Sequence, residues 1–142
     1  MRKMIMGVVV MGAAAALSWT VLHSPKGASC ASFAVVNTAA TRTADAALVK
    51  QKSEQHVVAD DIGLVLEQAP WRLVWATPND AERGVFFFKQ TDDKGYQLVD
   101  IWGGVLAPED RAGAVDWASQ LKGGGPSPAL IECFVDAVAS GQ

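Results

Sequence analysis

The sequence predicts an α+β fold, in which a small antiparallel sheet of three or four strands follows an N-terminal helical region and precedes two C-terminal helices. Three observations support this prediction. Apolar residues recur at helical spacing between residues 44 and 69, and three short apolar or alternating segments follow between residues 71 and 102. Two further helical stripes each begin at a proline, Pro108 and Pro128. We therefore expect one globular domain over residues 44–142.

Residues 1–29 have the pattern of a targeting segment, which is set apart from the fold. Arg2 and Lys3 precede an uncharged run over residues 4–22, and small or polar residues follow it. This order is typical of an export signal. The run also approaches the ~20 residues that span a bilayer, so an uncleaved anchor in the inner membrane is the alternative. In both cases the basic head keeps the N-terminus inside, and we expect the domain to be exported, either periplasmic or secreted.

The two cysteines, Cys30 and Cys133, give the next prediction. In an oxidising compartment they are expected to form one disulfide that ties the N-terminal end of the domain to its last helix. Small residues fit signal cleavage after Ser29, Ala31 or Ala34, and only the first of these sites leaves Cys30 in the product. Lipid attachment at Cys30 is a third alternative, which the charge of Lys26 nearby disfavours.

Charge excludes two classes of partner. Of the 12 basic residues, three lie in the first 29, so nine remain against all 15 acidic residues. An acidic domain is repelled by phosphate backbones, and the sequence contains no basic stripe, so we expect no nucleic-acid binding. A polybasic membrane patch is also missing from the sequence. Membrane contact is therefore expected only through the N-terminal segment.

The elements are predicted in chain order. Residues 30–43 are small and threonine-rich and indicate a flexible tether, with Thr43 as the N-cap of a helix. Over residues 44–69 the spacing predicts one helix or two, since Gly63 weakens the middle, and Pro70 ends it. Strands are expected over residues 71–76, 84–89 and 96–102, joined by turns of hairpin length into a meander. Residues 31–36 are a candidate fourth, edge strand.

The C-terminal region predicts two helices. Pro108 opens the first, which ends at Lys122, and a glycine run then leads to Ser127 as the cap of the second. That glycine run, residues 123–125, does not match a phosphate-binding loop, in which the lysine follows the glycines. Cys133 falls on the border between the apolar and polar faces of the last helix.

The residues contain no recognisable catalytic or metal-binding motif. His56 is the single histidine after residue 29, and zinc needs three or four nitrogen or sulfur ligands, so we expect no metal and no cofactor. Asp100 stands out because it interrupts an apolar strand, sharing one face with Leu98 and Trp102. A buried carboxylate needs a partner, for which Arg72, Arg83 or Arg111 is expected. The hypothesis is a polar anchor in an aromatic ligand pocket, which would be lined by Trp71, Arg72, Trp75, Tyr96, Asp100 and Trp102.

These observations lead to three functional hypotheses. The first is an exported, non-catalytic binding or assembly module of the cell envelope, whose partner is an unknown protein or a small apolar ligand. The second is a small periplasmic hydrolase that uses Asp100 with a second carboxylate, Asp80 or Glu82. The third is a secreted inhibitor or immunity-type protein, whose acidic loops (Asp80, Glu82, Asp92 and Asp93) meet a basic target.

Overall fold

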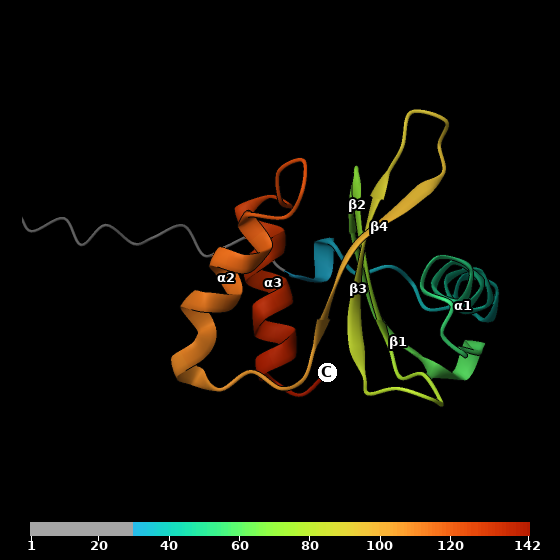
Figure 1. The fold of residues 1–142 in the computed structure, drawn as a ribbon, viewed down its shortest axis with the longest axis horizontal. Coiled ribbons are helices and arrows are strands. Elements are labelled where there is room, and N and C mark those ends of the chain that lie inside the picture. Colours follow the sequence, from blue (N-terminus) through green and yellow to red (C-terminus); the bar gives the residue numbers. More distant parts are fainter. Residues whose placement is uncertain (1–29) are drawn as a thin grey trace, which may run out of the picture.

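The computed structural model describes residues 30–142, which form three layers (Figure 1). The middle layer is a four-stranded antiparallel sheet in the order β1-β2-β3-β4, so that each strand pairs with its neighbour in sequence. Helix α1 covers one face of this sheet, and α2 and α3 cover the other. The predicted α+β class and the antiparallel meander are confirmed. The predicted export signal or anchor, residues 1–29, lies outside the described residues.

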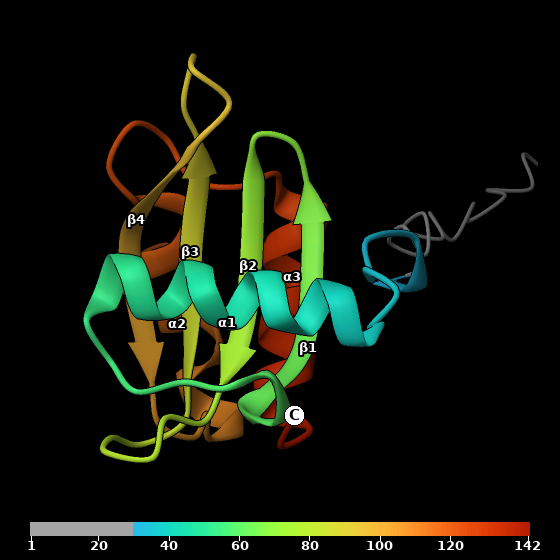
Figure 2. The same cartoon turned by 90° about the vertical axis from the view of Figure 1, so that its right-hand side faces the viewer.

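The strands are short and the longest element is the first helix. The helices are α1 (Ala39–Ser53), α2 (Arg111–Ser119) and α3 (Pro128–Ala139), with short 3-10 turns at Cys30–Ser32, Ala59–Asp61 and Pro108–Asp110. The strands are β1 (Ile62–Gln68), β2 (Trp71–Ala76), β3 (Gly84–Gln90) and β4 (Tyr96–Gly103). Figure 2 shows α1 crossing in front of all four strands.

The prediction of helix over residues 54–69 is wrong, because β1 occupies residues 62–68. It adds a fourth strand to the three that were predicted. β1 pairs with β2 through Val65↔Val74 and Leu66↔Leu73. Val65 and Leu66 are both buried, since helices cover both faces of the sheet. A strand buried on both sides shows no period-two alternation, and its continuous apolar run resembles a helical stripe.

The N-terminal boundary also differs from the prediction. The helix begins at Ala39, and Thr38 rather than Thr43 is its N-cap, with the Thr38 hydroxyl accepting from the Thr41 N–H at 3.1 Å. The segment expected as a tether, residues 30–43, thus contains a 3-10 turn and the start of α1. Residues 31–36 form no strand but a single bridge, Ala34↔Leu66, at the edge of β1.

The two C-terminal helices agree with the prediction. Ser127 caps α3, with its side chain accepting from the Leu130 N–H at 3.2 Å. Cys133 is buried rather than at the border of the helix, and it forms the predicted disulfide with Cys30, which is 103 residues away. None of the helices within residues 30–142 is long and apolar enough to span a bilayer.

The sheet separates two apolar cores. The core under α2 and α3 holds aromatic rings such as Phe87 and Phe134, together with Cys133. The core under α1 is smaller and mainly aliphatic, with Val49, Val65 and Val74 among its buried residues. Along each strand, successive side chains therefore point alternately into one core and the other. The position of a candidate residue in its strand thus determines which of the two cores it faces.

Candidate functional site

The predicted pocket residues are divided between the two faces of the sheet. Trp71, Trp75 and Trp102 pack into the core under α2 and α3. Tyr96 packs against the core under α1, and Arg72 reaches Asp45 on α1 itself. A single aromatic pocket lined by all of these side chains is therefore not formed.

A β-bulge in β4 explains why the predicted grouping around Asp100 is wrong. Phe87 pairs with Asp100, but the next residue, Phe88, pairs with Leu98, so Val99 is an extra residue in β4. One extra residue reverses the alternation of side chains beyond it. As a result, Leu98 lies on the α1 side and Trp102 on the other side.

Asp100 is exposed instead of buried among aromatic rings. Its Oδ1 accepts a hydrogen bond from the backbone N–H of Ile101 at 2.8 Å. The arginines expected to pair with it have other partners: Arg72 binds carboxylates under α1, and Arg111 binds Glu132 and Asp136. The proposed role of Asp100 as a buried anchor thus loses its geometric basis.

The charged centre of the α1 face is a bidentate pair between Arg72 and Asp45. The Arg72 Nε donates to Asp45 Oδ1 at 2.8 Å, and Nη2 donates to Oδ2 at 2.9 Å. The Asp45 side chain is 3% exposed and the Arg72 side chain 13%. Nη1 donates to Glu67, which stands directly opposite Arg72 in the β1–β2 register. The Tyr96 hydroxyl donates to the same carboxylate oxygen of Glu67 at 3.3 Å.

This cluster changes the titration of two of its members. Burial by itself lowers the pKa of Arg72, but the hydrogen bonds and charge of Asp45, followed by those of Glu67, outweigh burial and raise it. The guanidinium therefore stays charged at every accessible pH. Burial, followed by the negative charge of Glu67, raises the pKa of the Tyr96 phenol.

An open hollow of about 390 Å³ lies beside this cluster, between α1 and the sheet. Asp45, Arg72 and Tyr96 form its polar part. Its wall on α1 is formed by Ala44, Ala47, Leu48 and Gln51. The hollow thus combines apolar helix surface with a paired guanidinium and a phenol.

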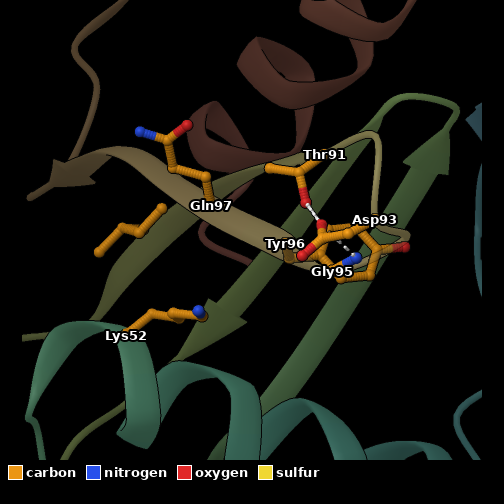
Figure 3. A pocket seen from close by; sticks show the side chains of 7 residues that line it. Lys52, Thr91, Asp93, Gly95, Tyr96 and Gln97 are labelled. Atoms are coloured by element: carbon orange, nitrogen blue, oxygen red, sulfur yellow. Dashed lines mark hydrogen bonds between the residues drawn. The ribbon is translucent and has the colours of Figure 1, made fainter.

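A second open hollow, of about 500 Å³, continues past Tyr96 toward the β3–β4 hairpin (Figure 3). Lys52 approaches it from α1, while the Thr91 hydroxyl donates to Asp93 Oδ1 at the hairpin. The hydrogen bond from Thr91, and then that from the Gly95 N–H, lower the pKa of Asp93. Because Tyr96 lines both hollows, we treat them as one surface, the α1–β4 groove.

The acidic loops do not form one patch. Asp80 and Glu82 lie in the connection between β2 and β3, and Asp92 and Asp93 lie in the β3–β4 hairpin. In an antiparallel meander these connections are at opposite ends of the sheet, as Figure 2 shows. Within residues 30–142, no cluster of three or more histidine, cysteine or acidic side chains is arranged to hold a metal ion.

Sequence reasoning missed Asp45, Glu67 and Lys52. Asp45 lies on the same stripe of α1 as Val49, four residues later, and both are buried, which is the signal that could have marked it. Glu67 was placed in a helix, where its cross-strand position opposite Arg72 could not be seen. Assigning residues 62–68 to a strand next to residues 71–76 would have revealed this opposite-charge pair.

Comparison of the chain with protein-family models, with curated proteins and with solved structures gave no match.

Proposed function

We propose that this protein is an exported, non-catalytic binding or assembly module of the cell envelope, and that the α1–β4 groove is its binding surface. The observation that supports this proposal is the pair of adjoining hollows that share Tyr96. Their combined lining of aliphatic helix surface, one phenol and the charge of Lys52 suits a partner protein segment or a small apolar ligand with a polar end.

The disulfide supports the exported location. A bond between Cys30 and Cys133 is stable in the periplasm or outside the cell, and it is rare where cytosolic thiols are kept reduced. It also favours signal cleavage before Cys30, because cleavage after Ala31 would remove that cysteine. Lipid attachment is disfavoured for a similar reason, since a lipidated Cys30 sulfur cannot pair with Cys133. The alternative location remains an uncleaved inner-membrane anchor with the domain outside.

Each of the two rival functions requires certain side chains to lie close together, and the fold keeps these side chains apart. A hydrolase would need Asp100 close to Asp80 or Glu82. Asp100 is in register with Phe87, whose ring lies under α2 and α3, whereas Asp80 accepts from the His56 N–H on the α1 side. An inhibitor with one acidic surface would need the loops at the two ends of the sheet to act together. The binding module needs neither arrangement.

Site-specific photocrosslinking in the cells that export the protein tests the proposal. Gln51, which lines the groove, is replaced by a photoreactive phenylalanine derivative, and Gln120, exposed at the end of α2, provides the matched control. We expect one discrete adduct from position 51 and none from position 120. The intact mass of the adduct and of the free protein, with and without reduction, identifies the partner, the processed N-terminus and the disulfide.

A second substitution links the adduct to the groove. Lys52→Glu reverses the charge at the groove without touching the core, and it should reduce the yield of the position 51 adduct. Equal adducts from positions 51 and 120, or a yield that is insensitive to Lys52→Glu, would contradict a specific binding surface here. Recovery of a reduced cytoplasmic species would contradict export.

A further inference from the structure

The two edges of the sheet differ in how they are covered. At the outer edge of β1, the Val35 N–H donates to the Val65 carbonyl oxygen at 2.9 Å. The Glu67 N–H donates to the Phe33 carbonyl oxygen at 2.8 Å, so the N-terminal segment covers this edge. β4 is the last strand on the other side, and among residues 30–142 no strand pairs with its outer edge (Figure 2). The backbone groups along β4 are therefore open to a further strand.

One hydrogen bond of β3 shows which way the backbone groups of β4 point. The Gln90 N–H donates to the Pro70 carbonyl oxygen at 2.7 Å, so it is directed toward β2 and away from β4. In an antiparallel pair, two opposite residues direct their N–H and C=O groups either toward each other or both away. Tyr96 stands opposite Gln90, and Leu98 follows two residues later with the same alternation. The N–H and C=O groups of Tyr96 and Leu98 therefore point to the free edge.

The edge is closed beyond the bulge at Val99. By the same alternation, the next outward N–H belongs to Ile101, which stands opposite Phe86. This N–H already donates to Asp100 Oδ1 at 2.8 Å. Bulges and charged side chains are common protections of strand edges. The part of the edge that can take a strand is therefore residues 96–98.

This open part of the edge runs along the α1–β4 groove. Tyr96, Gln97 and Leu98 all line its hollow of about 500 Å³ (Figure 3). The side chains of Tyr96 and Leu98 lie on the α1 side of the sheet. A residue that pairs with either of them points its own side chain to the same side, and thus into the hollow.

The hollow also favours one charge on an incoming segment. Lys52 approaches it from α1. The Asp93 carboxylate lines the same hollow, but it already accepts from the Thr91 hydroxyl and from the Gly95 N–H. The positive charge of Lys52 therefore suits an acidic side chain on the partner.

We propose that the α1–β4 groove binds an extended segment of a partner protein, which adds to the sheet as a fifth strand beside residues 96–98 and places an acidic side chain near Lys52. The proposal rests on the function proposed above, since it names the partner of the same groove. Strand addition at Tyr96 and Leu98 makes about four backbone hydrogen bonds. The side chains that face α1 then provide the specificity.

Selection from a phage-displayed library of random heptapeptides, with the protein recovered from the exporting cells as bait, tests the proposal. We expect enriched peptides that carry an acidic residue and bind saturably. N-methylation of such a peptide at successive positions should weaken binding at every second residue, because only alternate N–H groups face β4. A ligand that merely fills the hollow shows no such alternation.

A change of one backbone atom in β4 locates the bound peptide. Insertion of the α-hydroxy analogue of leucine at Leu98 replaces the outward N–H by an ester oxygen and keeps the side chain. Affinity should fall about three- to tenfold, as expected for loss of one hydrogen bond. The corresponding ester at Ile101, whose N–H is held by Asp100, is the matched control and should leave the affinity unchanged.

Three results would each overturn strand addition: no enriched peptide, N-methylation tolerated at every position, or unchanged affinity of the Leu98 ester. If position 51 still gives its adduct in these cases, the groove binds another occupant, such as a small apolar ligand, and the proposed function stands. A missing adduct from position 51 together with ester-sensitive peptide binding would instead contradict the proposed function.

Discussion

The face of the sheet under α2 and α3 is filled by aromatic rings, whereas the face under α1 places a buried ion pair among aliphatic side chains. On the first face, the Phe134 ring centroid lies 4.9 Å from that of Phe87 and 5.8 Å from that of Trp102, and a disulfide joins α3 to the N-terminal segment. On the second face, Asp45 of α1 and Arg72 of β2 form a buried ion pair between helix and sheet. The first face is a purely apolar core, whereas the second combines a smaller apolar core with a buried ion pair.

The difference predicts where stability and the proposed binding are located. Aromatic pairs add roughly 0.5–1.5 kcal/mol each beyond the area that they bury, so the face under α2 and α3 stabilises the domain directly. A buried ion pair often contributes little net stability, because desolvation offsets the attraction. Its position next to Glu67 and Tyr96 gives it another role, which is to hold the polar wall of the α1–β4 groove in one arrangement.

Breaking the ion pair from one side should produce the largest effect. In Arg72→Met the Asp45 carboxylate stays buried without its counterion, and the free energy of unfolding should fall by about 3–5 kcal/mol. The double variant Arg72→Met with Asp45→Leu should recover most of this loss, since no charge is then left buried. Urea unfolding of the three proteins measures the difference.

Arg111→Met provides the control for that experiment. Arg111 also binds two carboxylates, Glu132 and Asp136, but its side chain is 38% exposed, so its loss should cost less than about 1 kcal/mol. Equal losses in Arg72→Met and Arg111→Met would mean that solvent screens both pairs alike. The proposed contrast between the two faces would then fail.

Removal of the disulfide should have the next largest effect and should act mainly on the other face. The bond closes a loop of 103 residues, and such bonds typically stabilise by about 2–4 kcal/mol. The double variant Cys30→Ser with Cys133→Ser should lose about this much in urea unfolding. Hydrogen exchange should accelerate first at the Val35 and Glu67 amides, which bond to the Val65 and Phe33 carbonyls at the β1 edge.

The amide of Val49 in the middle of α1 provides the internal control for this variant. Its helix packs on the opposite face of the sheet and has no direct link to the disulfide, so its protection should follow only the global loss of stability. Preferential loss of protection in α1 would show that the two faces are coupled through the sheet. The claim that the disulfide acts mainly on the face under α2 and α3 would then be wrong.

The same contrast explains how far the sequence predicts this molecule. Local patterns suffice for β3, β4 and the proline-initiated helices, since turn residues and caps lie next to them in the chain. β1 could not be recognised, because burial of both Val65 and Leu66 hides its alternation. The pair of Asp45 with Arg72 joins residues 27 apart, and the bulge at Val99 depends on the register with β3, so neither follows from local spacing.

Titration of Tyr96 should give the smallest effect and the most local information. Tyr96 is the single tyrosine in the chain, so phenolate absorbance reports on it alone. Burial and then the charge of Glu67 raise its pKa, and the midpoint should lie above the ordinary value of about 10. Glu67→Gln should move the midpoint back toward that value, whereas Glu132→Gln, on the other face, should not.

The sign of this shift also predicts a dependence of stability on pH. Folding favours the neutral phenol, so its contribution is complete below the unfolded pKa of about 10 and is lost as the pH rises through the higher folded pKa. Tyr96→Phe should remove this decline while leaving the stability at neutral pH nearly unchanged. A midpoint at or below the ordinary value, or one that does not respond to Glu67→Gln, would show that the phenol does not belong to the Arg72 cluster. The cluster would then not extend into the α1–β4 groove.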